Sequence, residues 1–384
     1  MSNVKTSKPK KVMLINANMK MGGSERVAAK TANILSEEYD VCLLVFDDSE
    51  AVFVPDCEVI CIGVPAKNGI VNKVKNVFKR SHLIRKEKKK RSIDISISFG
   101  PSANLVNVLS KRNELVISEI RAYVHKKLSC VDKYVYKHSD KIVCCSKEIE
   151  KKIWTGCPIV KDKTRVIYNP YDIAEIQKQG QEQVTDYEFN SKTIISHGRL
   201  NPVKGYDNLI KAFSIVRKQI PDAKLLIIGE GSEKGKLQTL INSLNLSDSV
   251  TLLGLRKNPY AYLSKSTLFV MSSHTEGFPN SLVEAMVFLP VISTDCPSGP
   301  REILRNTYSD KSVDDIENAD YGILVPSSSQ SVIEDLNTQN TMLANAIIRT
   351  VESTDVLETN KKLAQKRARS FSYELYKSKL EECF

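Results

Sequence analysis

No apolar run in this 384-residue sequence is long enough to cross a lipid bilayer, which needs roughly 20 consecutive apolar residues. We expect no export signal at the N-terminus, because Asn16 and Asn18 interrupt the short apolar stretch that follows its basic residues. The nine cysteines are odd in number and contain no C-x-x-C pair, and most lie in apolar segments. Reduced, buried thiols of a cytoplasmic protein are therefore expected.

Basic residues are in excess, with 56 Lys and Arg against 45 Asp and Glu, a formal net charge of +11 and a pI near 9.0. This charge indicates an anionic partner, and a nucleotide sugar, a lipid phosphate or a nucleic acid would satisfy it. The excess is densest in 72–91, where apolar residues recur at near-helical spacing. That segment is either an amphipathic helix on an anionic membrane or a solvated helix face. No RNP, zinc or helix-turn-helix pattern accompanies the charge, so nucleic acid is not the expected partner.

Short Val/Ile/Leu-rich runs alternate with helical patterns along the whole chain. Continuous apolar runs of this length are typical of parallel strands that are covered on both faces. The pattern therefore predicts an α/β protein with two Rossmann-like, doubly wound domains. The expected strands occupy 12–18, 40–46, 57–63, 93–100, 114–120, 141–146, 164–170, 193–200, 223–231, 249–255, 267–273, 290–296 and 321–326.

The chain is predicted to divide near its middle, where residues 171–192 are polar and have no strand signal. This expected linker separates an N-terminal domain over 1–185 from a C-terminal domain over 190–364. Ligands of open parallel sheets bind beyond the carboxyl ends of the strands, so we expect the two domains to face each other across a ligand-binding cleft. The last residues, 365–384, are expected to form a helix that packs back on the first domain.

Two strand-end turns carry residues suited to a phosphate group. Gly22 and Gly23 stand between the first strand and a helix that Ser24 is placed to cap. They would let a phosphate approach the helix N-terminus, or they could serve the turn alone, since the spacing matches neither G-x-G-x-x-G nor a P-loop. Arg199 and Lys204 follow the first strand of the second half, and they are either a diphosphate clamp or two solvated cations.

The stretch TEGFPNSLVEAM, Thr275 to Met286, places Glu276 before a Gly-Phe-Pro turn and Glu284 in the helix that follows. Ser281 and Glu284 spell S-x-x-E, so a helix capping box is the structural interpretation of Glu284. Glu276 has no such capping role. Its carboxylate, at the end of an expected strand, is suited to accept hydrogen bonds from sugar hydroxyls, while Glu284 could reach a ribose diol.

The E-x7-E spacing of Glu276 and Glu284 resembles the signature of family 4 of the retaining nucleotide-sugar glycosyltransferases, which have the two-domain GT-B architecture. Further stretches agree in family order with members that build bacterial surface glycans, at 21–27, 166–172, 197–205 and 293–304. The resemblance covers almost the whole chain. It implies transfer of a hexose or N-acetylhexosamine from a nucleoside-diphosphate sugar, with UDP favoured over GDP. The implied acceptor is a polyprenyl-diphosphate-linked glycan or a polysaccharide, and anomeric configuration would be retained.

The resemblance also implies residue roles. Glu276 would bind the donor sugar, Glu284 the ribose, and Arg199 and Lys204 the diphosphate, whose developing charge they would stabilise. The other donor-binding candidates implied are Gly22, Gly23, Arg256, Gly277, Phe278, Pro279, Asn280 and Ser281. No D-x-D motif occurs in the sequence, so we expect no metal and no cofactor beyond the nucleotide-sugar substrate.

In the first domain, ISEIRAYVHKK (117–127) resembles a turn of bacterial relatives that glycosylate lipid-linked acceptors. It implies Glu119 as a catalytic candidate and Arg121 as an acceptor-side candidate. Gly100 is a second acceptor-side candidate. Many relatives have a histidine near the reacting carbon, but none can be assigned here. His125 is interpreted as a surface residue and His197 as a structural one.

Two other functions stay open on the sequence. One is a GT-B nucleotide-sugar epimerase, which would need catalytic acids and histidines in both domains, and the five histidines form no convincing pair. The other is a nucleic-acid-binding protein that uses the positive charge. The favoured enzyme is expected in the cytoplasm, peripherally on the inner face of the cell membrane.

Overall fold

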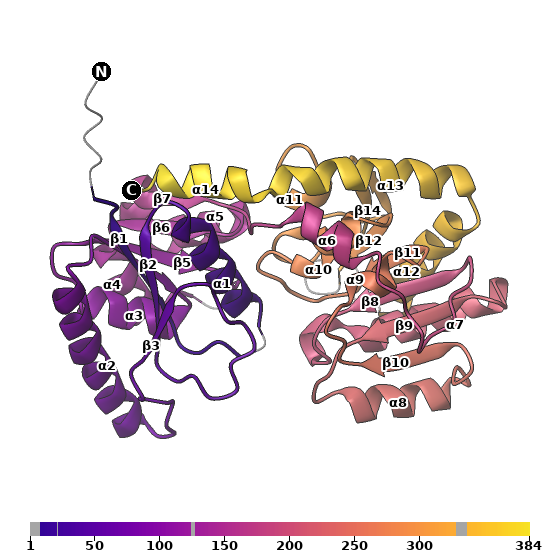
Figure 1. Cartoon of the computed structure of the whole chain (residues 1–384). Helices are drawn as coiled ribbons and strands as arrows, with labels where there is room; N and C mark the ends of the chain where they lie inside the picture. Colours follow the sequence, from indigo (N-terminus) through magenta and orange to yellow (C-terminus); the bar gives the residue numbers. More distant parts are fainter. Residues whose placement is uncertain (1–7, 21, 124–126, 328–335) are drawn as a thin grey trace, which may run out of the picture. The chain divides into compact units, whose positions relative to one another are not determined.

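A computed structural model describes residues 8–20, 22–123, 127–327 and 336–384 (Figure 1). The chain forms two compact units. The first comprises Met1–Pro170 with Tyr373–Phe384, and the second comprises Tyr171–Ser372. Within the described ranges, each unit contains one seven-stranded sheet with helices around it.

The sheet of the first unit is parallel throughout, in the order β3-β2-β1-β4-β5-β6-β7. Strand β1 pairs with β2 on one side and with β4 on the other, so the direction of winding reverses between β1 and β4. The strands are β1 (Lys11–Asn16), β2 (Asp40–Val45), β3 (Glu58–Cys61), β4 (Ile95–Phe99), β5 (Leu115–Ile120), β6 (Lys141–Cys144) and β7 (Thr164–Val166). The helices are α1 (Gly23–Ser36), α2 (Ile70–Arg91), α3 (Pro101–Leu109), α4 (Cys130–His138), α5 (Lys147–Gly156), the 3-10 helix η1 (Pro158–Lys163) and α14 (Tyr373–Glu381).

Both faces of this sheet are buried, as the side chains of β1 illustrate. Val12 and Leu14 belong to a core cluster with α1 and α14, whereas Met13 and Ile15 belong to a second cluster with Ile84 of α2. Successive side chains of a strand point to opposite faces, so a strand covered on both sides is apolar at every position. The helix pair α1 and α14 therefore covers one face, and α2 and α3 cover the other.

The second unit repeats this winding in the order β10-β9-β8-β11-β12-β14-β13, with only β13 antiparallel among the described strands. Its strands are β8 (Thr193–His197), β9 (Lys224–Ile228), β10 (Val250–Gly254), β11 (Leu268–Met271), β12 (Val291–Thr294), β13 (Glu317–Ala319) and β14 (Gly322–Val325). Its helices are α6 (Ile173–Gln179), η2 (Pro202–Lys204), α7 (Tyr206–Gln219), α8 (Lys234–Ser243), α9 (Tyr260–Leu263), α10 (Asn280–Met286), α11 (Pro300–Leu304), α12 (Leu336–Val351), α13 (Thr354–Ala368) and η3 (Arg369–Phe371).

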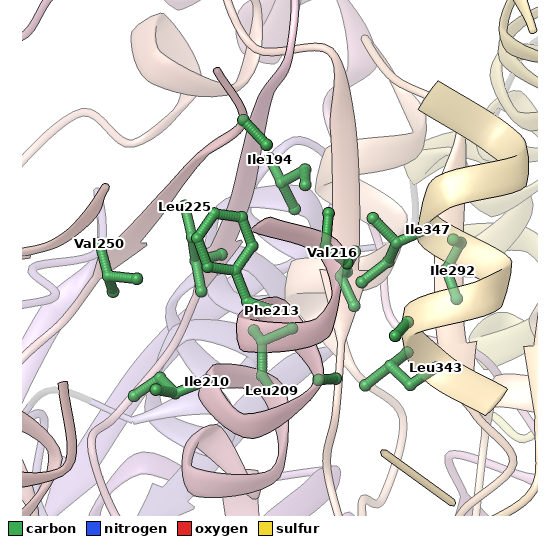
Figure 2. Close-up of a cluster of buried hydrophobic side chains, with 14 of the residues drawn as sticks. Ile194, Leu209, Ile210, Phe213, Val216, Leu225, Val250, Ile292, Leu343 and Ile347 are labelled. Atoms are coloured by element: carbon green, nitrogen blue, oxygen red, sulfur yellow. The ribbon is translucent and has the colours of Figure 1, made fainter. Parts of the chain in front are cut away.

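One face of the second sheet packs against α7 and α12. Figure 2 shows Phe213 of α7 among Leu225 of β9, Ile194 of β8 and Ile347 of α12, and all four side chains are buried. Burying one such side chain contributes about 1.5–3 kcal/mol relative to leaving it in water. This core gives the loops at the strand ends a rigid base.

The predicted fold class of two Rossmann-like units is confirmed, and all thirteen expected strands occur. Strand β13 was not predicted, because its three residues, Glu-Asn-Ala, contain no apolar run. None of the described helices combines the length and the apolar character needed to span a membrane.

The segment expected as a linker, 171–192, instead packs on the second unit. It contains α6, whose Ile176 is buried, and the Ser264 hydroxyl donates a hydrogen bond to the Gly180 carbonyl at 2.6 Å. The amide of Asn258 donates to the Gln179 carbonyl at 2.8 Å. Because these contacts bind the segment to α9 and its surroundings, the units divide at Pro170 and not at 185–190.

Residues 365–384 do not form the single helix that was expected. Helix α13 ends at Ala368, and the turn η3 and an extended Ser372 precede α14. Ser372 forms a β-bridge with Tyr171, which is incompatible with a continuous helix. Only Tyr373–Phe384 belongs to the first unit.

Candidate active site

Two loops of the second unit lie at the point where its strand order reverses. Strands β8 and β11 are adjacent and parallel, but the chain continues from β8 to β9 on one side and from β11 to β12 on the other. Ligands of doubly wound sheets bind outside the carboxyl ends of the strands at such a switch point. Here those ends lead into Gly198–Gly205 and Ser272–Pro279, the loops that carry the predicted sugar and diphosphate residues.

Lys204 and Glu276 meet across this switch point. Lys204 ends the short helix η2, and its Nζ lies 2.6 Å from Oε1 of Glu276. The hydroxyl of Ser273, from the same loop as Glu276, donates to that oxygen at 2.7 Å. The side chains of Lys204 and Glu276 have 20% and 13% of their surface exposed to solvent, so both are held in place and still accessible. The arrangement offers a cation and a charged acceptor side by side, which suits a ligand with both phosphate and hydroxyl groups.

The backbone of Glu276 is held by the turn that follows β12. The Glu276 N–H donates to the Pro297 carbonyl at 2.6 Å, and the Ser298 N–H donates to the Glu276 carbonyl at 2.9 Å. The Ser298 hydroxyl donates to the Gly277 carbonyl at 2.8 Å. Behind this turn, the buried side chains of Arg301 and Asp295 form two hydrogen bonds, at 2.8 and 2.9 Å. The Pro-Ser-Gly-Pro stretch therefore positions Glu276 through its main chain.

Gly205 explains how the two loops approach each other so closely. Its φ of +60° is in the left-handed region, and a Cβ at this position would lie 2.3 Å from the Ser272 carbonyl oxygen. The His274 N–H donates to the Val203 carbonyl at 2.8 Å, and the Ser272 hydroxyl donates to the Lys204 carbonyl at 3.0 Å. Only glycine fits this crossing, which fixes Lys204 against the Glu276 loop.

Glu284 is not a capping residue. Helix α10 begins at Asn280 after Pro279, its start has no side-chain cap, and Glu284 is the fifth residue of the helix. Its carboxylate is fully buried, with Oε2 at 3.3 Å from Nε2 of His197. The S-x-x-E interpretation is therefore wrong, and the structural role of His197 stays a prediction. Burial leaves the Glu284 carboxylate with essentially no surface for a ligand in this structure. Contact between Glu284 and a ribose therefore stays a prediction.

Arg199 and Arg256 differ in how firmly their side chains are held by neighbouring residues. Arg199 follows β8 and is exposed. Arg256 follows β10, and its guanidinium binds the Asp186 carboxylate at 2.7 Å and the Tyr262 hydroxyl at 3.1 Å. Arg256 is thereby oriented at the strand end, whereas Arg199 is the adaptable cation of the pair predicted to bind a diphosphate.

The remaining donor-side candidates form the turn between Glu276 and α10. Phe278 and Pro279 are buried, and the Phe278 ring packs edge-on against Phe371 with centroids 5.4 Å apart. Oδ1 of Asn280 accepts a hydrogen bond from the Tyr171 hydroxyl at 2.6 Å. Ser281 is buried and Gly277 is half-buried. The Phe278 and Asn280 side chains thus help to hold the backbone of this turn.

The glycine candidates of the first unit lie at its own switch point. Gly22 is the extended residue before α1, which begins at Gly23, so Ser24 does not cap the helix as expected. Gly100 precedes α3 with a φ of +89°, where a residue other than glycine would be strained. These glycines follow β1 and β4, the two strands between which the order of the first sheet reverses.

Glu119 and Arg121 do not face an open site. The carboxylate of Glu119 is fully buried and ion-paired with Arg121, and the Tyr376 hydroxyl of α14 donates to it at 3.3 Å. Arg121 also binds the side chain of Asn169. Burial raises the pKa of the Glu119 carboxyl, an effect that Arg121 opposes. The pair fixes the C-terminal helix on the first unit, so in this structure its side chains are not available to a substrate. His125 lies outside the described residues.

Comparison with known proteins decides the family. The model for glycosyl transferases group 1 matches residues 177–336, which include every candidate of the second unit. The N-acetylgalactosamine-N,N'-diacetylbacillosaminyl-diphospho-undecaprenol 4-alpha-N-acetylgalactosaminyltransferase of Campylobacter jejuni is 32% identical over 301 residues, which cover 73% of this chain and 80% of that protein. This chain belongs to the group 1 glycosyltransferases. The resemblance inferred from the motifs is therefore confirmed.

Other relatives of this glycosyltransferase agree. An uncharacterized glycosyltransferase of Methanocaldococcus jannaschii is 39% identical over 271 residues, 67% of this chain and 66% of that relative, which is just under two thirds of its length. The structure of HepE from Anabaena in complex with UDP superposes with a TM-score of 0.72 at 19% identity, over 97% of this chain and 98% of HepE. That similarity concerns the fold alone, and it supports the predicted GT-B class.

Sequence analysis missed several residues around the Lys204–Glu276 pair. Ser273 was assigned only to a strand, although a hydroxyl three residues before a strand-end carboxylate could have suggested a hydrogen bond. Ser298 was included only within the family-like stretch 293–304. Its hydrogen bonds to the loop after β11 join segments 22 residues apart, and no local pattern indicates such a contact.

Proposed function

We propose that this glycosyltransferase moves a hexose or N-acetylhexosamine from a nucleoside-diphosphate sugar, UDP in preference to GDP, with retention of configuration. The acceptor would be a polyprenyl-diphosphate-linked or polysaccharide glycan in bacterial surface-glycan synthesis. Support for such an acceptor comes from the undecaprenol-linked substrate that the Campylobacter relative's name describes and from an amylovoran biosynthesis glycosyltransferase of Erwinia amylovora, 28% identical over 313 residues. Support for UDP comes from the UDP complexes of solved proteins of this fold.

The observation that carries the proposal is the Lys204–Glu276 pair at the β8/β11 switch point. An ammonium group has three donors, so Lys204 could keep Glu276 and still donate to a phosphate oxygen. Exposed Arg199, from the same loop, would supply a second cation for the diphosphate. Glu276 would accept hydrogen bonds from the sugar hydroxyls, which places the anomeric carbon next to the diphosphate.

The proposed reaction breaks the bond between the anomeric carbon and the diphosphate oxygen. An acceptor hydroxyl attacks that carbon from the face that the diphosphate leaves, and its proton passes to the departing phosphate. Negative charge grows on the diphosphate as the bond lengthens, and Lys204 and Arg199 would stabilise it more strongly in the transition state than in the bound substrate. The absence of a D-x-D motif is the reason to propose that these two cations act without a metal.

The proposed donor specificity is tested by incubating the protein with a panel of UDP- and GDP-sugars without acceptor, with and without EDTA. We expect slow release of UDP from one UDP-hexose or UDP-N-acetylhexosamine, and the same rate in EDTA. Release from none of the donors would contradict the function. A donor epimer that accumulates without free diphosphate would identify an epimerase instead, and loss of release in EDTA would overturn metal independence.

A further inference from the structure

Helix α2 exposes large apolar side chains in its N-terminal half. Ile70, Val71, Val74 and Phe78 keep 81%, 66%, 49% and 69% of their exposure. Val71, Val74 and Phe78 are spaced three and four residues apart, so they lie on one face of the helix. Clustered large apolar side chains on a soluble surface usually mark an interaction site.

The same outward side of α2 is strongly basic. The exposed charged residues of the whole helix are all cations, namely Lys73, Lys75, Lys79, Arg85, Lys86, Lys89 and Lys90. The one acidic residue in the helix, Glu87, is half-buried and paired with Arg91 at 3.2 Å. An apolar stripe surrounded by cations without exposed carboxylates is complementary to an anionic lipid surface, which offers phosphates above an apolar interior.

The structure shifts the expected contact toward the start of the helix. Lys88 is buried, with Nζ at 2.7 Å from the Glu114 carboxylate and 2.6 Å from Oδ1 of Asn107. Arg91 makes two hydrogen bonds to Glu58, at 2.6 and 2.7 Å. Part of the basic run within 72–91 therefore holds the helix on the first unit. Apolar side chains that are exposed to solvent and free to contact a partner lie in the first turns, Val71–Phe78.

The inward side of α2 makes it a rigid platform. The Arg80 guanidinium stacks over the Phe46 ring at 4.3 Å and donates two hydrogen bonds to the Val64 carbonyl, while Ile84 is fully buried in the core. Because the helix is already folded and anchored by these contacts, a partner on its outer side would not have to induce it. None of these anchoring contacts involves Val71, Val74 or Phe78.

We propose that the outer face of α2 docks this protein on an anionic lipid bilayer. Val71, Val74 and Phe78 enter the headgroup region, and the lysines around them contact lipid phosphates. The inference rests on the proposed function only in that a lipid-linked acceptor requires the enzyme at a membrane. Nucleic acid is disfavoured as the partner, because an exposed aliphatic and phenylalanine stripe at the centre of the patch has no counterpart on a phosphate backbone.

The test is flotation of the full chain with vesicles made of equal parts of phosphatidylcholine and phosphatidylglycerol, and with vesicles of phosphatidylcholine alone. We expect binding to the anionic vesicles that weakens as salt is raised. The double substitution Val74→Ser with Phe78→Ser should weaken binding by on the order of tenfold, through lost apolar burial. Lys75→Glu with Lys79→Glu should weaken it by at least about twentyfold, since each basic residue near the surface contributes about a fivefold factor and each new carboxylate is repelled by the anionic lipid.

Matched control variants show whether an effect depends on the outer face of α2 or only on the change in apolar or charged residues. Leu375→Ser changes an exposed apolar side chain on α14, which packs with α1 on the opposite face of the first sheet. Lys362→Glu with Lys366→Glu makes the same charge change on exposed positions of α13. Both controls should bind vesicles like wild type. Phe78→Trp should show a blue-shifted emission with anionic vesicles, beyond the signal of Trp154.

Binding by the α2 variants at wild-type strength, or no binding of wild type to anionic vesicles, would overturn the proposal. The proposal would also be overturned if wild type does not float with vesicles but binds a short oligonucleotide, and the α2 variants bind that oligonucleotide more weakly. Donor hydrolysis in solution should be unchanged in the α2 variants, because none of these residues is in the proposed active site. Vesicle binding without any donor turnover would therefore indicate failure of the proposed function and not of the docking face.

Discussion

Lys204→Ala is expected to lower kcat for sugar transfer by about 100- to 1,000-fold, the usual effect of removing one preorganised donor to a developing anion. Lys204 reaches the switch point through a turn that ends in Gly205, and its Nζ lies 2.6 Å from the Glu276 carboxylate. Alanine removes the cation and leaves the turn itself intact. Substrate binding should weaken less than kcat falls, because the charge that Lys204 stabilises is largest in the transition state.

The measurement is steady-state release of nucleoside diphosphate with the donor found in the panel, together with the melting temperature. The fold should survive, since the Glu276 carboxylate keeps the Ser273 hydroxyl and partial access to water. Arg217→Ala is the matched control, because Arg217 also pairs with a carboxylate, Asp248, at 2.7 Å. That pair involves a residue before β10, at the amino end of the strand, so its loss should leave kcat unchanged. Wild-type turnover by Lys204→Ala would contradict the proposed role of Lys204 in the diphosphate site.

Glu276→Ala should lower kcat/KM by about 100- to 1,000-fold, for a reason different from that of Lys204→Ala. Hydrogen bonds from sugar hydroxyls to a carboxylate are roughly twice as strong as those to a neutral acceptor, and they orient the anomeric carbon. Glu276→Gln keeps the shape and one acceptor oxygen but loses the charge. It should therefore fall between wild type and alanine, by about tenfold.

The Glu276 series is read with the same diphosphate-release assay, and Asp248→Ala serves as its control. If Lys204 and Glu276 act as one unit, the double alanine variant should lose less than the product of the two single losses. Equal activities for wild type, Glu276→Gln and Glu276→Ala would exclude a role for this carboxylate in sugar binding.

Much of the fold follows from the sequence because its signals are local. Parallel strands covered on both faces are continuously apolar, which located β1 to β12 and β14. Strand β13 escaped because an edge strand of three residues needs no apolar run. The polar composition of 171–192 indicated a linker, but its hydrogen bonds to Asn258 and Ser264 depend on backbone carbonyls and leave no trace in composition.

The candidate site was predictable where it depends on strand ends. Lys204 and Glu276 were selected because each follows an apolar run, and the structure brings them together. A capping box was the structural alternative for Glu284 because S-x-x-E matched, but the N-cap is Pro279, two residues before Ser281. Glu119 and Arg121 were expected at a ligand because 117–127 resembles a turn of bacterial relatives. Their burial depends on Tyr376, more than 250 residues away in sequence, which no local pattern reveals.

The proposed mechanism requires that the loops after β8 and β11 bind a nucleoside diphosphate through Lys204. Calorimetric titration of wild type, Lys204→Ala and Arg217→Ala with UDP, GDP and uridine measures this binding. We expect one UDP site in wild type and Arg217→Ala, a large loss of affinity for UDP in Lys204→Ala, and no effect of that substitution on the weaker binding of uridine. Equal affinity for UDP in all three proteins, or no binding of either diphosphate to wild type, would contradict it.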